Sequence, residues 1–361
     1  MQEKIHKYSD CKYHELSIMI SEREKNMRGQ ISIFEEDINK VIDADFIDWG
    51  ILNNKTIFIT GATGLIGSSV IRSLDQVNLR YSLNITVIAL VRDEERARKR
   101  FADILDNGML TVLVGTVENP PIVEGNVDYI LHAASQTASK EFVQHAVETI
   151  ETSILGTFNM LRLAKSKAVR GFVYLSSMEV YGYPERGHKV TENEIGSLNP
   201  LELRNSYPIS KMMSEAMCCA YAKEYGVPAM ICRLTQTFGP GVNYNDTRIF
   251  AYFGRCVSEK KNIVLKTKGE TERCYLYTTD AVTAILLIML KGDPGKAYNA
   301  ADEDTYCSIA EMAEYVAADA GIKVEYEIQD LKENGFPQTL YMNLDTTALK
   351  QLGWRPRGGI R

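Results

Sequence analysis

Tyr207 and Lys211 are the residues of this sequence whose types and spacing most directly suggest chemistry. They stand four positions apart, which places both side chains on one face of a helix. An ammonium group beside a phenol favours the phenolate and lowers the phenol pKa from about 10. Such a tyrosine can take a proton from a hydroxyl while a hydride leaves the same carbon. We therefore predict that Tyr207 is an acid/base residue and that Lys211 lowers its pKa.

Ser177 is the second candidate, because it closely follows the apolar run Gly171–Leu175. A doubly wound sheet places its active site at the carboxyl ends of its strands. We expect the Ser177 hydroxyl to hydrogen-bond the reacting oxygen and to direct it towards Tyr207. A Tyr/Lys pair alone is common on helix surfaces and a lone serine often caps a loop, so the prediction depends on finding all three together.

A glycine-rich loop follows the apolar run Thr56–Thr60 and opens a helical pattern. Gly61 permits the turn, Gly64 lets the backbone approach a pyrophosphate, and Gly67 lets the helix pack on the strand. The helix N-terminus then presents free N–H groups and a positive dipole to the phosphates. We predict a dinucleotide bound by Gly61, Thr63, Gly64, Leu65, Ile66 and Gly67.

The residues after the next apolar run, Ile85–Val91, leave the dinucleotide open. An acid at the end of this strand would bond the ribose hydroxyls of NAD, but Asp93 comes two places later than expected. Arg92 would accept the 2′-phosphate of NADP, and it would serve equally well as a solvated residue opening a charged helix. We place Arg92 at the cofactor site and keep both NAD and NADP.

Short apolar runs alternate with amphipathic patterns from Lys55 onwards, which predicts an α/β fold with a doubly wound parallel sheet, the Rossmann architecture. The expected strands are Thr56–Thr60, Ile85–Val91, Thr111–Val114, Tyr129–His132, Gly171–Leu175 and Ala229–Cys232. The expected helices are Ser68–Leu74, Glu94–Leu105, Ile154–Ser166, Tyr207–Tyr225 and a buried helix from Ala281.

Three regions follow from these patterns. Residues 1–50 are charged, with apolar residues at helical spacing, and predict a helical extension that packs on the main domain or forms an oligomer contact. Residues 51–235 form the NAD(P)-binding domain. Residues 236–361 form mainly a smaller, loop-rich substrate-binding lobe, from which a late strand and helix return to the core. The apolar residues of the extension are Ile31, Ile33, Phe34, Ile38, Val41 and Ile42.

Composition excludes several classes of protein. Of 361 residues, 45% are hydrophobic and 24% are charged, which is typical of a globular chain with a large core. The formal charge of −6 gives no basic footprint for nucleic acid, although local arginines can still bind phosphate. Seven scattered cysteines form no CxxC pair and no His/Cys cluster, so we expect reduced thiols and no metal. The charged N-terminus and the short apolar runs favour a cytoplasmic protein without a membrane span.

With these motifs in order, the sequence from about Lys55 to Pro356 resembles the extended short-chain dehydrogenase/reductases, specifically the NAD-dependent nucleotide-sugar epimerases and dehydratases. The matching segments, besides the glycine loop, are His132-Ala133-Ala134-Ser135, Ser177–Gly182, Tyr207–Lys211, Arg233 with Phe238–Gly241, Glu270–Arg273, Tyr298-Asn299 and Leu352–Pro356.

The resemblance implies a set of roles. Tyr207 is the acid/base, Lys211 holds the nicotinamide ribose, and Ser177 positions the sugar oxygen. Arg273 pairs with the diphosphate of a nucleotide-diphosphate sugar, a task suited to its planar fork of donors, with Gln236 beside it. A tightly bound, recycled NAD or NADP and a homodimer are also implied. The remaining cofactor contacts implied are Val117, Ala133, Ala134 and Ser135.

Several positions depart from the family pattern. Met178 stands where many 4,6-dehydratases have a second acid, which argues against a standard dehydratase. Glu179 remains, and the resemblance implies a catalytic role near carbon 5, as in dehydratases and uronate decarboxylases. The Arg204–Tyr207 run also resembles that of UDP-glucuronate decarboxylases. Gln236 replaces a frequent asparagine. Thr116 and Ser153 replace a usual aspartate and asparagine, which alters the adenine side.

We therefore expect an enzyme in which Tyr207 accepts the proton of the 4-hydroxyl, giving a 4-keto sugar. Glu179 then transfers a proton at the neighbouring carbon. The outcome is epimerisation, dehydration or decarboxylation, which the sequence leaves open. One alternative is a dissociating NADPH-dependent carbonyl reductase, supported by Arg92. Another is a non-catalytic nucleotide-sensing protein, which the joint presence of Ser177, Tyr207 and Lys211 disfavours.

Overall fold

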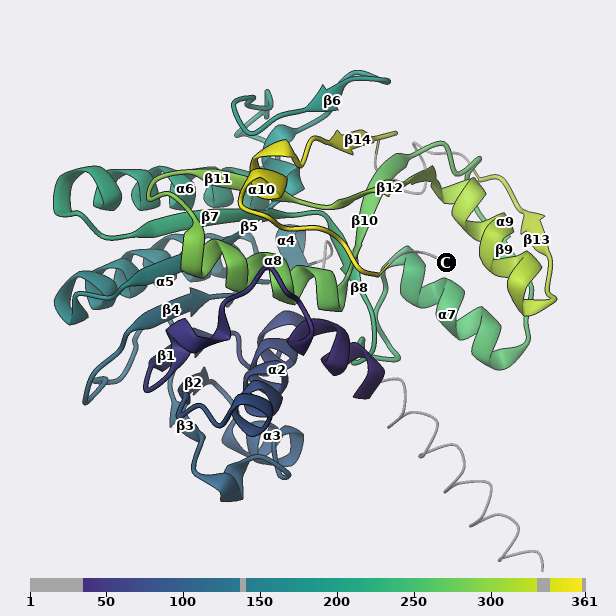
Figure 1. Ribbon diagram of the computed structural model, residues 1–361. Helices are drawn as coiled ribbons and strands as arrows, with labels where there is room; N and C mark the ends of the chain where they lie inside the picture. The colour runs from purple at the N-terminus through teal and green to yellow at the C-terminus, as the bar shows by residue number, and fades with distance from the viewer. Residues whose placement is uncertain (1–34, 137–140, 330–337, 359–361) are drawn as a thin grey trace, which may run out of the picture.

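A seven-stranded parallel sheet forms the centre of the computed structural model, which describes residues 35–136, 141–329 and 338–358 (Figure 1). Its strand order is β11-β7-β5-β4-β1-β2-β3, and every neighbouring pair is parallel. The strands are β1 (Thr56–Thr60), β2 (Thr86–Val91), β3 (Leu110–Val114), β4 (Tyr129–His132), β5 (Gly171–Ser177), β7 (Ala229–Leu234) and β11 (Ala297–Ala300). The predicted doubly wound α/β fold is confirmed, and all six predicted strands lie in this sheet.

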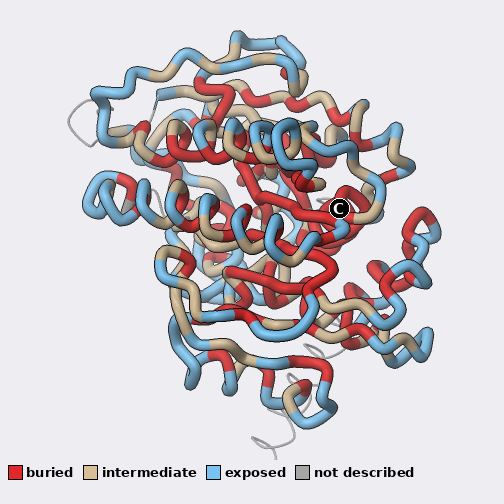
Figure 2. The backbone as a smooth tube through the Cα atoms, turned by 90° about the vertical axis from the view of Figure 1, so that its left-hand side faces the viewer, coloured by how far each residue is buried: buried red, intermediate tan, exposed pale blue. Residues whose placement is uncertain are grey.

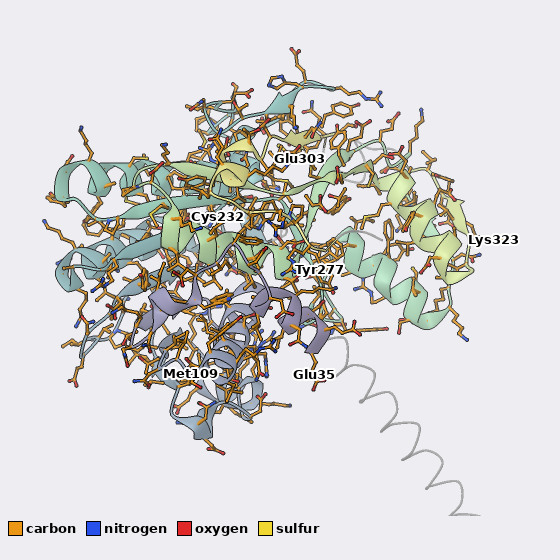
Figure 3. All side chains as sticks on the ribbon, in the orientation of Figure 1. Glu35, Met109, Cys232, Tyr277, Glu303 and Lys323 are labelled. Atoms are coloured by element: carbon orange, nitrogen blue, oxygen red, sulfur yellow. The ribbon has the colours of Figure 1, made fainter. Side chains whose placement is uncertain are left out.

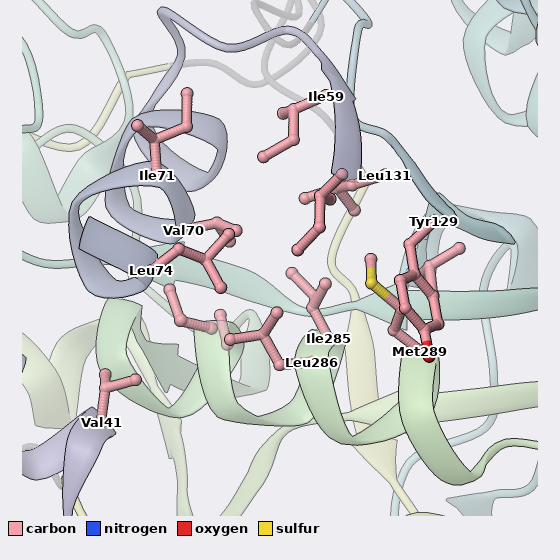
Figure 4. Close-up of a cluster of buried hydrophobic side chains, with 14 of the residues drawn as sticks. Val41, Ile59, Val70, Ile71, Leu74, Tyr129, Leu131, Ile285, Leu286 and Met289 are labelled. Carbon is pink, nitrogen blue, oxygen red and sulfur yellow. The ribbon is translucent and has the colours of Figure 1, made fainter. Parts of the chain in front are cut away.

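Both faces of the sheet are buried, which explains why its strands have continuous apolar runs. Along β1, Ile57 and Ile59 join one core cluster and Phe58 joins the other. The first cluster lies under helices α2 (Leu65–Tyr81) and α8 (Thr278–Lys291), as Figure 4 shows for Ile59, Ile71 and Ile285. The second lies under α5 (Ala146–Lys167) and α6 (Ser206–Tyr225). Figure 2 shows the buried residues concentrated along these central strands.

Of two predicted helices, one matches the structure and the other ends early. The run from Ala281 lies in α8, whose residues are buried nearly throughout, as expected. Helix α3 (Glu94–Arg100) ends earlier than predicted, because Phe101 leaves the helical conformation and is fully buried in the first core cluster. The shorter elements are α4 (Glu141–Gln144), α10 (Thr347–Gln351) and the 3₁₀ turns η1 (Trp49–Leu52), η2 (Leu105–Asn107), η3 (Met178–Tyr181) and η4 (Leu203–Asn205).

A second group of elements follows β8 and contains more regular structure than the expected loop-rich lobe. A five-stranded sheet has the order β12-β10-β14-β6, with β8 paired to β10, and β13 pairs with β9. These strands are short, and the seven-residue β12 is mainly polar, so they lack a clear apolar signal. Helices α7 (Ile249–Glu259) and α9 (Ile309–Ala320) share a core with them. The strands are β6 (Lys189–Val190), β8 (Gln236–Phe238), β9 (Ile263–Leu265), β10 (Glu272–Tyr277), β12 (Asp302–Ser308), β13 (Val324–Tyr326) and β14 (Tyr341–Leu344).

The described part of the N-terminal extension packs on the main domain. Residues 35–42 form a helix, and Ile38, Val41 and Ile42 are buried in the first core cluster. Ile31, Ile33 and Phe34 lie outside the described residues. The hydroxyl of Tyr277, labelled in Figure 3, donates a hydrogen bond to the Asp37 carboxylate at 2.8 Å, which ties the extension to the end of β10. Across the described residues, no helix combines the length and apolarity needed to cross a bilayer.

Candidate active site

The glycine loop between β1 and α2 accepts no larger residue at two positions. Gly61 has a φ of +65°, and a Cβ there would lie 2.6 Å from the Ala133 carbonyl oxygen. A Cβ on Gly67 would lie 2.4 Å from the Gly61 carbonyl oxygen. Helix α2 has no side-chain cap and no acid in its first turn, so its first N–H groups are available to a phosphate. These features fit the pyrophosphate of a dinucleotide.

The neighbouring strands β1 and β4 place the His132–Ser135 segment beside this loop. The Thr60 hydroxyl lies 2.8 Å from His132 Nδ1 and accepts hydrogen bonds from the backbone N–H groups of Ala133 and Ala134, each at 3.1 Å. Burial lowers the pKa of His132 to about 3, so its ring is neutral at physiological pH. The predicted cofactor residues from β1 and β4 therefore meet at the point where the strand order reverses.

The first turn of α6 brings the predicted catalytic residues together. Tyr207 is 8% exposed, and the side chains of Ser177 and Ser135 lie close enough to its phenol to lower its pKa. The Lys211 Nζ lies 5.6 Å from the centre of the Tyr207 ring and donates to the Leu175 carbonyl oxygen at 2.7 Å. Three residues predicted for catalysis, Ser177, Tyr207 and Lys211, thus lie together with Ser135, which was predicted from its place along the cofactor.

The electrostatics of this pair differ from the sequence prediction. Burial raises the pKa of Tyr207, and the nearby Glu179 carboxylate acts in the same direction. Hydrogen bonds with Ser177 and Ser135 lower that pKa only in part. Burial also lowers the pKa of Lys211 to about 7. The expected lowering of the Tyr207 pKa by Lys211 is therefore wrong for the chain by itself, since the ammonium is desolvated and its bond goes to a backbone carbonyl.

Glu179, the fourth predicted catalytic residue, forms an ion pair that connects it to the Tyr207 ring. Its Oε2 lies 2.9 Å from Arg204 Nη2, and the Arg204 guanidinium lies 4.9 Å from the centre of the Phe142 ring. Phe142 in turn stacks on Tyr207, with 4.2 Å between ring centres and 2° between planes. The Arg204–Tyr207 run had drawn attention to Arg204 in the sequence. Nothing in the sequence pattern singled out Phe142.

Met178 contributes no acid to this pocket. Its side chain is buried, and its sulfur accepts a hydrogen bond from the Thr235 hydroxyl at 3.3 Å. The position is therefore occupied by an apolar group packed into the fold.

Arg273 and Gln236 lie on neighbouring strands of the second sheet, β10 and β8. Arg273 Nη1 donates to Gln236 Oε1 at 3.3 Å. Arg273 Nε is buried and has no hydrogen-bond partner among the described residues. Buried polar groups of proteins are nearly always paired, so this donor is suited to an anionic ligand. The structure brings together two of the three residues predicted to bind the substrate, Ser177 being the third.

A buried network behind the pocket was not anticipated from the sequence. Glu215, one helical turn after Lys211, accepts hydrogen bonds from the Ser176 hydroxyl at 2.5 Å and from Arg233 Nη2 at 2.7 Å. Arg233 also donates to the Tyr181 hydroxyl at 2.8 Å. The network joins α6, β5 and η3, which carry Tyr207, Ser177 and Glu179. The conventional four-residue spacing of Tyr207, Lys211 and Glu215 on one helix face was the available signal.

The strand order, the glycine loop and the Ser177–Tyr207–Lys211 arrangement define a Rossmann-fold, nicotinamide-dependent enzyme of the short-chain dehydrogenase/reductase type. The sequence profile of the NAD dependent epimerase/dehydratase family matches residues 57–301, and the chain belongs to this family. The predicted family, enzyme class and nicotinamide cofactor are thereby confirmed. Among the described residues, no group of three or more His, Cys, Asp or Glu side chains is placed to hold a metal ion.

Several known proteins are similar to the chain. UDP-glucuronic acid decarboxylase 6 of Arabidopsis thaliana is 28% identical over 310 residues, covering 86% of each chain. UDP-glucuronic acid decarboxylase 1 of Xenopus tropicalis is 30% identical over 238 residues, covering 66% of this chain and 54% of that protein. The structure of a dTDP-glucose 4,6-dehydratase from Streptomyces venezuelae with NAD has a TM-score of 0.70 at 23% identity, covering 84% of this chain and 92% of that one. This last likeness shows the fold.

Proposed function

We propose that this enzyme oxidises carbon 4 of a UDP-activated hexuronic acid and decarboxylates the resulting 4-keto sugar. The observation that carries the proposal is the Glu179–Arg204 ion pair, which lies beside Tyr207 through Phe142. Met178 supports it, because a buried thioether cannot serve as the second acid of a dehydration. The names of similar proteins, UDP-glucuronic acid decarboxylases of plants and vertebrates, point to the same reaction class.

The first step is removal of the 4-hydroxyl proton. Ser177 and Tyr207 hold that oxygen between them, and the phenol takes the proton as the carbon–hydrogen bond breaks. Bound NAD would supply the acceptor for the hydride that leaves carbon 4, and the positive charge of its oxidised ring would lower the pKa of the neighbouring Tyr207 phenol. Lys211, whose Nζ lies 5.6 Å from the centre of the Tyr207 ring, would donate to the nicotinamide ribose.

The second step follows from the position of the new ketone. A carboxylate on carbon 5 is β to the carbonyl at carbon 4, so loss of carbon dioxide leaves its bonding electron pair in an enolate. Tyr207 and Ser177 stabilise the enolate oxygen by hydrogen bonds. Carbon 5 gains one proton, which Glu179 takes up from water and transfers to it. Return of the hydride to carbon 4, with a proton from Tyr207 to the oxygen, completes a cycle that consumes no cofactor.

The test is to incubate the purified protein with NAD and UDP-glucuronic acid, and in parallel with UDP-, dTDP-, CDP- and GDP-hexoses. We expect loss of carbon dioxide from the uronic acid alone. Mass spectrometry and NMR of the product are the measurements. An unchanged mass with inverted carbon 4 would refute decarboxylation in favour of epimerisation. Loss of water from a hexose would instead favour a dehydratase.

The finer assignments of the site belong to this proposal. Arg273 and Gln236 bind the diphosphate, a role supported by the unpaired, buried Nε of Arg273. Residues 51–235 bind the cofactor and most of residues 236–361 bind the substrate. Helix α8 and strand β11 belong to the second range but pack on the central sheet.

We also propose that the chain forms a homodimer through α5 and α6 and resides in the cytoplasm. The two helices share a core cluster and expose large apolar side chains, which is typical of a surface that a partner covers. These side chains are Val147, Leu155 and Phe158 on α5 with Met213 and Tyr225 on α6. The cysteines of the described residues are free thiols, which supports a reducing compartment.

A dissociating NADPH-dependent carbonyl reductase is the second candidate, since Arg92 is exposed directly after β2. NADPH consumed in proportion to product would support this candidate. A cofactor that stays bound through many turnovers would exclude it. A non-catalytic nucleotide-sensing role would require that Tyr207→Phe leaves every measured property of the protein unchanged.

A further inference from the structure

Two opposite charges lie at the carboxyl edge of the sheet, on the side of β2 and β3. Arg92 follows β2 directly and is exposed, while Glu118 is partly buried in the segment after β3. The two strands are paired up to Val91 and Val114, so the segments that follow them leave the same edge. Strand β1, whose glycine loop fits the pyrophosphate, is the next strand beyond β2. The adenosine half of a dinucleotide that crosses this edge therefore extends towards Arg92 and Glu118.

The Glu118 carboxylate is held in position. The Thr152 hydroxyl of α5 donates a hydrogen bond to it, and the Thr116 hydroxyl forms another. The Asn159 amide donates to the Glu118 backbone carbonyl at 2.8 Å and to that of Val117 at 3.0 Å. An ionised carboxylate has about four acceptor sites, so these bonds leave part of its capacity free.

Glu118 carries a negative charge at neutral pH. Partial burial alone would raise its pKa, but hydrogen bonds with Thr152, its own backbone and Thr116, together with the charge of Arg92, bring the pKa below its ordinary value. Asp93 does not compete for this role, because its carboxylate caps α3 by accepting the Arg96 N–H at 2.9 Å. Asp93, the first acid after β2, is thus engaged in capping α3.

We propose that Glu118 makes this site selective for NAD over NADP. Its carboxylate compensates Arg92, which would otherwise attract a 2′-phosphate. A 2′-phosphate carries roughly −1.5 to −2 charge, by analogy with other phosphate monoesters at neutral pH, so it gains most from Arg92 when that arginine is not compensated. The adenosine of NAD adds no charge there. The inference rests on the dinucleotide site of the family and not on the sugar reaction.

The test is direct titration of both dinucleotides by calorimetry, using protein freed of bound nucleotide. We expect the unmodified chain to bind NAD more tightly than NADP. Glu118→Gln should strengthen NADP binding about five- to tenfold and change NAD binding less than twofold, as expected for removing one charge near a surface anion. Glu124→Gln is the matched control, because Glu124 is exposed in the same connection to β4 and makes the same change in net charge.

A double variant separates charge from structural disturbance. If Glu118 acts by compensating Arg92, Glu118→Gln with Arg92→Ala should lose the gain in NADP affinity. The amide oxygen of glutamine can still accept from Thr152, so the melting temperature should stay near that of the unmodified chain. An unchanged NADP-to-NAD ratio in Glu118→Gln overturns the proposal, as does a gain that persists without Arg92. Failure of the decarboxylation assay leaves these binding results untouched.

Discussion

The ring of Tyr207 is buried and closely packed, and its hydroxyl lies near polar side chains. Phe142 covers one face of the ring, and the hydroxyl contacts Ser135 and Ser177. The ring therefore contributes packing, whereas the oxygen contributes little beyond its two hydrogen bonds. The two contributions are separable by removing the oxygen alone.

We expect Tyr207→Phe to reduce turnover by about 10²- to 10⁴-fold, since a positioned acid/base group contributes about that much. Stability should change by no more than about 1–2 kcal/mol, because the ring and its stacking on Phe142 remain. Product formation and thermal unfolding are the measurements. Tyr183→Phe, at a tyrosine that is 49% exposed, is the control and should alter neither. Full activity in Tyr207→Phe would exclude the acid/base role.

The lowered pKa of the buried Lys211 predicts that the stability of the folded chain depends on pH. Burial lowers its pKa in the folded chain to about 7, against an ordinary value of 10.5. Between these values the unfolded chain binds more protons than the folded chain, so Lys211 contributes stability that grows as the pH rises and is lost as the pH falls towards 7. We expect the unfolding free energy of the unmodified chain, relative to Lys211→Met, to increase from pH 7 to pH 10. Denaturant titrations at several pH values measure it, and a parallel pair of curves would contradict it.

At the scale of elements, helix α6 organises the site. Tyr207, Lys211 and Glu215 recur every four residues along it, so all three face β5. Glu215 then fixes Ser176, the neighbour of Ser177, through the buried network with Arg233. One helix and one strand thereby hold the two halves of the catalytic arrangement in register.

Substitution of glycine by alanine should have opposite effects on stability in α2, which begins at the glycine loop, and in α7. Gly67→Ala would place a Cβ 2.4 Å from the Gly61 carbonyl, so we expect a loss of about 1–3 kcal/mol and weak dinucleotide binding. Gly254, in the middle of α7, is exposed, and a Cβ added there would meet nothing within 4 Å. Gly254→Ala should therefore stabilise the chain by about 0.5–1 kcal/mol. Chemical denaturation compares the two, and equal effects would show that the close approach is not the cause.

At the scale of the whole molecule, the proposed dimer forms through the α5–α6 surface. Leu155 is 47% exposed on α5 and lies on the same helix face as Val147 and Phe158. If two copies pair through this surface, Leu155→Glu places a charge in the interface and should convert a dimer to a monomer. Sedimentation or light scattering reports the mass. Leu79→Glu on α2 is the control, because Leu79 is 67% exposed away from these helices. A monomeric unmodified chain would contradict the proposed dimer.

The alternation of strands and helices was predictable from the sequence because hydrophobic periodicity and glycine sterics act over a few residues. β4 runs from Tyr129 to His132 as expected, and the Gly61–Gly67 loop joins β1 to α2 as expected. The second sheet was missed because its short polar strands, such as β12, carry no comparable local signal.

The sequence by itself determined the order of the elements and the chemical types at the site, because both follow from local spacing. Only the tertiary structure decided how those groups behave. The desolvation of Lys211, the stacking of Phe142 on Tyr207 and the electrostatic effect of Arg92 on Glu118 all depend on segments distant in the chain. Burial and long-range electrostatics arise only when such segments pack, which is why the direction of the Tyr207 pKa could not be inferred from its neighbour four residues away.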